Sequence, residues 1–399
     1  GKVRGEAAGR DSQALTPGLL SAVMDSWHKV CSNADLVIVE GAGSPAEINL
    51  RSNDIANMGF ATEASVPVVL VGDIDRGGVI ASLVGTHHIL PEADRRMIAG
   101  YLINKFRGDA SLFDDGIREI QKFTGWPCFG VIPWLEEAGR LPAEDSVILE
   151  RMAGGEAGAL KVAVPVLDRI ANFDDLDPLS AETDVEVIMV RPGETLPQDA
   201  GLVVIPGSKA TISDLQAFRR NGWDAQLQRH VRRGGHVIGI CGGYQMLGRM
   251  VSDPDGIEGD VTETQGLGLL DIETVMEPAK TVRNSEGWCE PFGTGLTGYE
   301  IHLGRTTGPD CARPFSTINA HPDGAVSENG RIMGTYLHGL FGNDDFRRVY
   351  LERLGIAGGG ENYRATVDAA LDQIADRLEA LISPDFPALE GSGPAFLTA

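Results

Sequence analysis

The stretch HVIGICGGYQMLGRM, residues 236–250, decides how the second half of this 399-residue chain folds. HVIGI is a short apolar run with β-branched residues, which is typical of a buried strand. CGG favours a tight turn, and YQMLGRM favours the beginning of a helix. Strand, turn and helix in this order predict a nucleophile elbow with Cys241 as the nucleophile.

The neighbours of Cys241 suit a reactive thiol. Small residues on both sides permit a strained turn, and the N-terminus of the following helix stabilises a thiolate. The backbone N–H of Gly242 is then placed to hold an oxyanion. A lone cysteine is more often a buried structural residue, but its position between glycines at a strand-to-helix turn favours the nucleophile.

A thiol nucleophile needs a base, and His338 is the best candidate among the eight histidines. It lies in GTYLHGLFGND (334–344), just after a short apolar strand, where loops gather at the carboxyl ends of a parallel sheet. A histidine there is otherwise a packed or surface residue. The loop VIPGSKAT (204–211) also ends a strand, and the N–H of Gly207 would supply a second oxyanion donor. The alternative is that this Pro-Gly sequence forms only a turn, without a role in the site.

Short apolar runs alternate with helical stretches along the chain, which predicts an α/β fold with two parallel-sheet domains. Small residues over 151–160 indicate a linker. The second series begins with a strand over 161–167 and continues through TGYEIHLGR and RIMGTYLHG. The expected regions are a first domain over 1–150, a second over 161–355, and a C-terminal helix and tail over 356–399 with a helix near 361–382. In the first domain we expect a helix over 17–32 and strands over 36–43, 66–75, 97–105 and 126–133.

Composition excludes several classes of protein. The net charge of −23 is spread along the chain and disfavours nucleic-acid binding, which needs a basic face. Five scattered cysteines without a CxxC pair argue against a disulfide framework or a zinc site. The start lacks a secretory signal, and no apolar run approaches the roughly 18 residues that cross a bilayer. We therefore expect a cytoplasmic protein with no membrane or nucleic-acid partner.

The run LVIVEGAG (36–43) places Glu40 at the carboxyl end of a predicted strand. A carboxylate there suits Mg²⁺ beside nucleotide phosphates, and the small residues let the backbone approach a ligand. An acidic strand end followed by a loop is an equally good interpretation. No GxxxxGK[ST] motif occurs, and the domain opens on a helix, so it either binds no nucleotide or lacks its first segment here.

The second half resembles the class I glutamine amidotransferases, which have a flavodoxin-like fold. The resemblance rests on strand–G–x–C–x–G–helix, the downstream His338 and the upstream Pro-Gly loop. It implies that Cys241 attacks the side-chain amide of glutamine, forms a glutamyl thioester and releases ammonia. That family usually has Glu two residues after the histidine, whereas position 340 is Leu. We therefore expect a Cys–His dyad, as in the subgroup that amidates corrinoids.

Nearly the whole chain resembles the cobyric acid synthases, which amidate peripheral carboxylates of the corrin ring in cobalamin biosynthesis. The motifs are VEGAGSPAEINL, VGDIDRGGVIASLVGT (71–86), INKFRGD (103–109), VIPGSK, GICGGYQMLG, GYEIHLGR and YLHGLF. The resemblance implies glutamine and a corrinoid polycarboxylate, an a,c-diamide, as substrates and ATP with Mg²⁺ as cofactors. The first half would be similar to dethiobiotin synthetase, a P-loop relative. In the first half of this family, ATP would phosphorylate a substrate carboxylate, and ammonia would displace the phosphate to leave an amide.

The same resemblance implies roles for further residues. Asn104 would lie near adenine, and Glu40 would help to hold Mg²⁺. Because the family begins with its phosphate-binding loop, we expect the synthetase domain to be N-terminally incomplete and unable to bind ATP productively alone. The residues expected near the phosphoryl group or the corrinoid are Asp73, Asp75 and Arg76.

GYEIHLGR places Glu300 and His302 on one strand face by the period of two. They would contact substrate or the domain interface, or form a structural pair. Two alternatives to the main interpretation stay open. One is an a,c-diamide synthase or another glutamine-dependent carboxylate ligase, and the other is a non-catalytic binding module with an amidotransferase fold.

Overall fold

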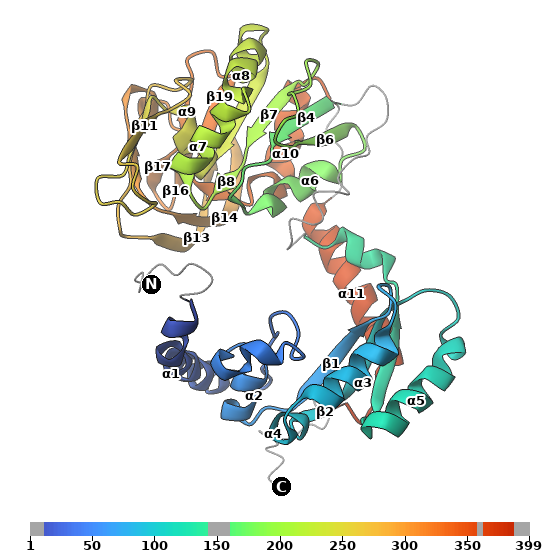
Figure 1. The fold of residues 1–399 in the computed structure, drawn as a ribbon. Helices are drawn as coiled ribbons and strands as arrows, with labels where there is room; N and C mark the ends of the chain where they lie inside the picture. The colour runs from blue at the N-terminus through green and yellow to red at the C-terminus, as the bar shows by residue number, and fades with distance from the viewer. Residues whose placement is uncertain (1–11, 143–159, 357–361, 387–399) are drawn as a thin grey trace. The chain divides into compact units, whose positions relative to one another are not determined.

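The computed structural model describes residues 12–142, 160–356 and 362–386. These residues divide into two compact units, one within Gly1–Arg140 and Ala370–Ala399 and the other within Leu141–Ala369 (Figure 1). Most of the predicted linker, 151–159, lies outside the described residues, and Leu160 already begins a strand. No helix of the described residues combines the length and apolar character needed to cross a membrane.

The first unit is built on a parallel sheet in the order β1-β2-β3. Helix α3 packs directly on this sheet at Gly72 of β1. A Cβ at Gly72 would lie only 2.7 Å from the side chain of Val79, so the close contact requires glycine there. The carboxyl ends of β1 and β2 are in register, with Asp73 opposite Asn104. The elements are α1 (Ser12–Cys31), η1 (Ile48–Asn53), α2 (Met58–Ala64), β1 (Val68–Asp73), α3 (Val79–Ile89), α4 (Glu92–Arg95), β2 (Ile98–Phe106), η2 (Ala110–Phe113), α5 (Asp114–Thr124), β3 (Cys128–Pro133) and η3 (Glu136–Arg140).

The strand predicted over 36–43 is wrong, because these residues form no strand in the structure. They carry exposed apolar side chains, and Ile38 is 84% exposed. A strand needs a neighbour that satisfies its N–H and C=O groups, and within the described residues none pairs with this segment. The apolar pattern therefore showed residue types that favour a strand, but it could not show whether a neighbouring strand was present to pair with them.

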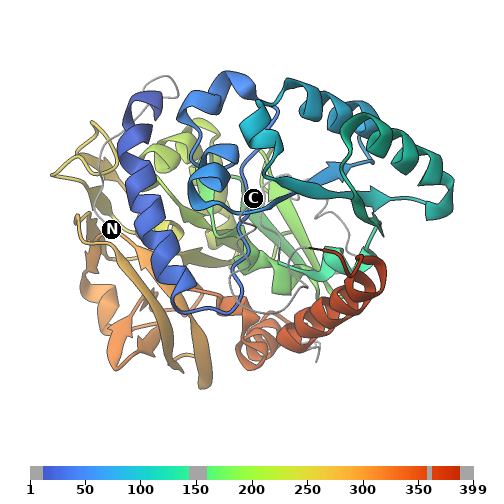
Figure 2. The same cartoon turned by 90° about the horizontal axis from the view of Figure 1, so that it is seen from below.

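The predicted C-terminal helix is present as α11 (Tyr363–Leu381), drawn in red in Figures 1 and 2. The residues after it pack on β3 of the first unit. The N–H of Ser383 donates to the carbonyl of Phe129 at 2.7 Å, and the ring of Phe386 meets the Phe129 ring edge-on. The last part of the predicted tail, 387–399, lies outside the described residues.

The second unit has a central six-stranded sheet in the order β18-β19-β9-β7-β4-β6, parallel except for β18. Its two faces have separate cores. Helices α7 and α8 lie on one face of this sheet, and α6 and α10 lie on the other (Figure 1). Side chains of the first two helices belong to one core, and side chains of the last two belong to the other. The elements are β4 (Leu160–Pro165), α6 (Asp177–Ser180), β6 (Val185–Val190), β7 (Leu202–Ile205), α7 (Thr211–Arg220), α8 (Trp223–Arg232), β9 (His236–Ile240), α9 (Gly242–Leu247), β18 (Ala325–Val326), β19 (Ile332–Thr335) and α10 (Asp344–Arg353).

Three further sheets complete the second unit, and their strands are antiparallel except for the parallel pair β10–β12. One sheet has the order β17-β16-β13-β14-β20, a second β11-β10-β12-β15, and a third β5-β8. Figure 2 shows the long β13–β14 hairpin, in tan and orange, apart from the green strands of the central sheet. The remaining elements are β5 (Ile170–Ala171), η5 (Phe173–Leu176), β8 (Gly207–Ser208), β10 (Met250–Ser252), β11 (Glu263–Gln265), β12 (Glu273–Val275), β13 (Thr281–Cys289), β14 (Thr294–His302), β15 (Arg305–Thr307), η6 (Pro309–Ala312), β16 (Ser316–Ile318), β17 (His321–Asp323), β20 (Leu337–His338) and η7 (Leu340–Gly342).

Two predicted members of the second α/β series differ from expectation. TGYEIHLGR forms β14, which pairs along its whole length with β13 and lies outside the parallel sheet. RIMGTYLHG divides between β19 in the central sheet and β20 in the antiparallel sheet. Short apolar runs look alike in both kinds of sheet, so the sequence did not separate them.

Candidate active site

Cys241 follows β9 directly and precedes α9, as the elbow predicts. Its φ of +52° lies in the left-handed region, which is strained for a residue with a side chain. Two backbone hydrogen bonds hold this conformation. The Cys241 N–H donates to the carbonyl of Thr335 at 2.8 Å, and the Gln245 N–H donates to the Cys241 carbonyl at 3.1 Å.

The glycine after the turn is required by close packing. A Cβ at Gly243 would lie 2.0 Å from the carbonyl oxygen of Ile205, at the end of β7. The elbow therefore sits directly against the neighbouring strand, and no side chain fits between them. This close contact is the physical reason why position 243, the second glycine of the CGG motif, requires glycine.

The base candidate His338 has a carboxylate partner, which corrects the predicted dyad. Its Nδ1 lies 2.7 Å from Oδ2 of Asp175, and both side chains are buried. The other Asp175 oxygen accepts the N–H of Gly339 at 2.5 Å. Position 340 is indeed a buried Leu, but the carboxylate comes from η5, far earlier in the chain. Sequence reasoning missed Asp175, because the acidic run around it gives no sign of which carboxylate turns inward.

The surroundings of His338 favour a protonated ring. Burial alone lowers the pKa of His338, but the charge and hydrogen bond of Asp175, together with Cys241, raise it to about 10. The ring is also stacked on Tyr299, with centroids 5.2 Å apart. An imidazolium held between a carboxylate and a sulfur can give a proton to a leaving group and take one back.

The two predicted oxyanion donors lie beside this pair. A Cβ at Gly207 would lie 3.1 Å from Cε1 of His338, and one at Gly242 would lie 2.9 Å from the backbone nitrogen of Ser208. The Gly207 loop is held by a buried carboxylate, because the Ser208 hydroxyl donates to Asp214 at 2.6 Å. The structure thus brings Cys241, His338, Gly207 and Gly242 together at the carboxyl ends of β9 and β7.

Strand β14 runs past the thiol. The Sγ of Cys241 lies 3.5 Å from the carbonyl oxygen of Ile301. The predicted pair lies on this strand: Glu300 is buried and accepts hydrogen bonds from Arg283 at 2.6 Å and Ser285 at 2.7 Å. His302 approaches Glu300 at 3.8 Å and stacks on Tyr336 with ring centroids 3.8 Å apart. These contacts favour the structural pair among the three predicted roles.

In the first unit, charged side chains gather at the carboxyl ends of β1 and β2. Asp73 forms an ion pair with Lys105 at 2.8 Å, and Asp75 with Arg107 at 2.7 Å. Arg76 lies 3.7 Å from Asp73. Asn104 lies opposite Asp73 on the next strand, and its side-chain oxygen accepts the N–H of Lys105. The basic residues Lys105 and Arg107 were not among the predicted site residues, although INKFRGD contains both.

Glu40 is exposed in the segment that forms no strand. Within the described residues, no group of three or more His, Cys, Asp or Glu side chains is arranged to hold a metal ion. The residues around Glu40 therefore do not form a Mg²⁺ site by themselves.

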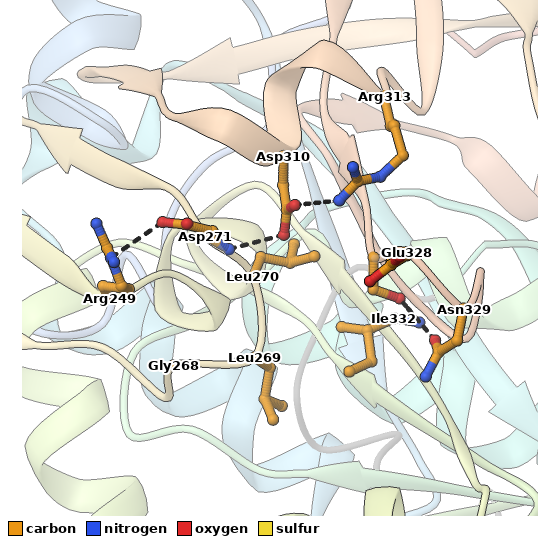
Figure 3. Close-up of a pocket in the computed structure, with 11 residues that line it drawn as sticks. Arg249, Gly268, Leu269, Leu270, Asp271, Asp310, Arg313, Glu328, Asn329 and Ile332 are labelled. Atoms are coloured by element: carbon orange, nitrogen blue, oxygen red, sulfur yellow. Dashed lines mark hydrogen bonds and ion pairs between the residues drawn. The ribbon is translucent and has the colours of Figure 1, made fainter.

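A separate hollow of about 590 Å³ lies elsewhere in the second unit (Figure 3). Arg249 on its wall pairs with Asp271 at 3.1 Å, and Asp310 pairs with Arg313. Asp310 also accepts the N–H of Asp271 at 2.7 Å. Its lining contains neither the thiol nor the base candidate.

Comparisons with known proteins agree with this division. Residues 10–148 match the model of the CobQ/CobB/MinD/ParA nucleotide binding domain, and residues 161–346 match the CobB/CobQ-like glutamine amidotransferase domain. A cobyric acid synthase of Sinorhizobium fredii is 70% identical over 96% of this chain and 79% of its own length. Cobyric acid synthases of Mesorhizobium japonicum and Rhizobium meliloti are 70% and 68% identical over 96% of this chain and 78% and 79% of their own lengths.

Proposed function

The chain belongs to the cobyric acid synthase family and is a glutamine-dependent amidoligase of cobalamin biosynthesis, and we propose that Cys241, His338 and Asp175 form its glutaminase centre. The observation that carries the proposal is the 2.7 Å contact between Asp175 and the buried His338, beside the strained Cys241. A nucleophile, a base and an orienting carboxylate are the three parts that acyl transfer requires.

In the proposed reaction, the Cys241 sulfur attacks the side-chain carbonyl carbon of glutamine. The N–H groups of Gly242 and Gly207 stabilise the negative oxygen that forms. His338 then gives its proton to the amide nitrogen, which leaves as ammonia when the C–N bond breaks. A water molecule, deprotonated by His338, cleaves the resulting thioester, and glutamate and the free thiolate are released.

Asp175 has three tasks in this scheme. Its Oδ2 fixes Nδ1 of His338 as the protonated nitrogen, so that Nε2 carries out the proton transfers. Its Oδ1 holds the backbone of Gly339, which keeps the ring from turning away. The carboxylate also stabilises the imidazolium that exists before ammonia leaves.

We further propose that the first unit activates a corrinoid carboxylate with ATP, so that the released ammonia can replace phosphate. The match to a nucleotide-binding model and the charged cluster at the ends of β1 and β2 support this assignment. Asn104, Asp73, Asp75 and Arg76 stay the candidate residues. A role of Glu40 with Mg²⁺ rests on the sequence motif alone.

Glutamine and a corrinoid polycarboxylate are the proposed substrates, and the cytoplasm is the proposed location. The proposed limits are a synthetase region over 1–150, a linker over 151–160, a glutaminase region over 161–355 and a C-terminal part over 356–399. The division into two units between Arg140 and Leu141 supports separate synthetase and glutaminase regions.

The test is trapping of the nucleophile. We expect 6-diazo-5-oxonorleucine, a glutamine analogue, to alkylate Cys241 and to stop release of ammonia from glutamine. Cys241→Ala should abolish both, whereas Cys289→Ala, which changes another buried cysteine, should preserve them. Labelling of a different cysteine, or undiminished hydrolysis by the Cys241 variant, would refute the assignment.

A further inference from the structure

Two segments of the second unit cross side by side between the same two sheets. The first leaves β17 of the antiparallel sheet at Asp323 and enters β18 of the central sheet at Ala325. The second leaves β19 of the central sheet at Thr335 and enters β20 of the antiparallel sheet at Leu337. The second crossing has one intervening residue, Tyr336, and ends at the base candidate.

The crossings are packed tightly against each other. Gly324, between the first pair of strands, has φ of +74°, and a Cβ there would lie 2.1 Å from the carbonyl oxygen of Gly334. No side chain separates the two backbones at this point. A polar group at the crossing must therefore find its partners within the protein.

Asp323 ties the two crossings together. Its Oδ1 accepts the N–H of Tyr336 at 3.2 Å, in the gap between β19 and β20. Its Oδ2 accepts the hydroxyl of Thr335 and that of Ser316, the latter at 3.1 Å. The Thr335 hydroxyl oxygen in turn accepts the N–H of Leu337 at 3.0 Å. One buried carboxylate thus organises three consecutive residues of the second crossing.

These three residues connect both sides of the proposed glutaminase centre. The carbonyl of Thr335 accepts the N–H of Cys241 at 2.8 Å, which anchors the strained elbow. Leu337 immediately precedes His338 within β20. The distance between sulfur and imidazole therefore depends on the path from Thr335 to His338, and Asp323 holds that path.

We propose that Asp323 is a positioning residue for glutamine hydrolysis, which sets the placement of His338 relative to Cys241 through the backbone of residues 335–337. The inference rests on the proposed function of Cys241 and His338. Asp323 touches neither of them, so its effect must pass through the crossing. A shift of about 1 Å between reacting groups can lower a rate by roughly 100-fold.

The central test is Asp323→Asn, which keeps shape and one acceptor. The new amide would donate to the hydroxyl oxygens of Thr335 and Ser316, and at Thr335 it would compete with the N–H of Leu337. We expect the kcat of glutamine hydrolysis to fall roughly 10- to 100-fold, with KM changed less than about 2-fold. Asp310→Asn is the matched control, since it neutralises another hydrogen-bonded carboxylate of the same unit, at the hollow in Figure 3.

Substitutions at Thr335 provide a second test of the same inference. Thr335→Val removes the hydroxyl but keeps the β-branched shape, and it should lower kcat like Asp323→Asn. Thr335→Ser restores the hydroxyl and should restore most of the rate. Because both changes act on one path, the double variant Asp323→Asn/Thr335→Val should lose little more than either single variant. Unfolding midpoints of all variants show whether they fold.

The outcomes separate this inference from the function on which it rests. If Cys241→Ala still hydrolyses glutamine, the proposed centre itself is wrong. If the centre holds but folded Asp323→Asn keeps its kcat, the positioning role is refuted. A loss of kcat in Thr335→Val that Thr335→Ser also shows, or a loss that Asp310→Asn reproduces, would also refute it, because such losses reflect general destabilisation.

Discussion

Asp175 and His338 are separated by 163 residues in the sequence, yet their Oδ2 and Nδ1 atoms lie 2.7 Å apart in a buried site. The same carboxylate holds the backbone N–H that follows the histidine. In the proposed centre, a short helical turn, η5, therefore supplies the orienting acid, far in the sequence from the position two residues after the histidine. The proposed centre is complete without an acid at position 340.

Asp175→Asn should lower the kcat of glutamine hydrolysis by roughly 100- to 10,000-fold, because an amide can hold His338 in the wrong tautomer. KM should change little, since Asp175 contacts Nδ1 of the His338 ring and we expect it to make no contact with glutamine. Steady-state ammonia release measures both constants. Asp174→Asn is the neighbouring control, and an equal loss in that variant would contradict a specific role of Asp175.

The pH dependence of the unfolding free energy should depend on the ion pair between Asp175 and His338. The pKa of His338 is raised to about 10, so its stabilising effect is complete below about 6.5 and is lost as the pH rises through 10. Wild type should therefore exceed Asp175→Asn in unfolding free energy most clearly near pH 6, and the gap should narrow towards pH 10. Urea unfolding at a series of pH values tests this, and a gap that widens with pH would exclude a buried imidazolium.

Gly207→Ala should impair hydrolysis through a steric effect. The added methyl would lie 3.0 Å from the carbonyl of Ala171 and 3.1 Å from the His338 ring, so the loop or the ring must move. We expect at least a roughly 10-fold loss of kcat, because the oxyanion donor and the base shift together. Gly342→Ala, which meets nothing within 4 Å, is the control. Equal activity of the two variants would show that Gly207 tolerates a side chain.

The titration of Asp323 should also change how the unfolding free energy depends on pH. Burial raises the pKa of Asp323 to about 6, although hydrogen bonds from Thr335, Tyr336 and Ser316 oppose the shift. The folded protein therefore binds this proton more tightly than the unfolded chain, and wild type loses stability as the pH rises from about 4 to 6. Asp323→Asn has no such proton, so its unfolding free energy should rise relative to wild type across this window. Glu300 and Arg283 also act on this carboxyl electrostatically, and a difference that is flat with pH would contradict its titration.

The sequence predicted the second unit well where chemistry and local pattern coincide. HVIGI and CGG fixed β9 and the turn at Cys241, because a buried strand followed by small residues has few other solutions. In the first unit, the strands predicted over 66–75, 97–105 and 126–133 formed as β1, β2 and β3, near their predicted positions. The strand over 36–43 failed, because the apolar pattern of a segment does not reveal whether a pairing partner exists.

The sequence by itself determined the family, the nucleophile elbow and the identity of the candidate base. These depend on residues close together in the chain, whose types and spacing carry the physical constraint. Only the tertiary structure decided that Asp175 faces His338, and that Asp323 joins two crossings between sheets. Both are contacts between segments distant in sequence, and a carboxylate acquires such a role only when folding removes it from water and leaves specific donors as its partners.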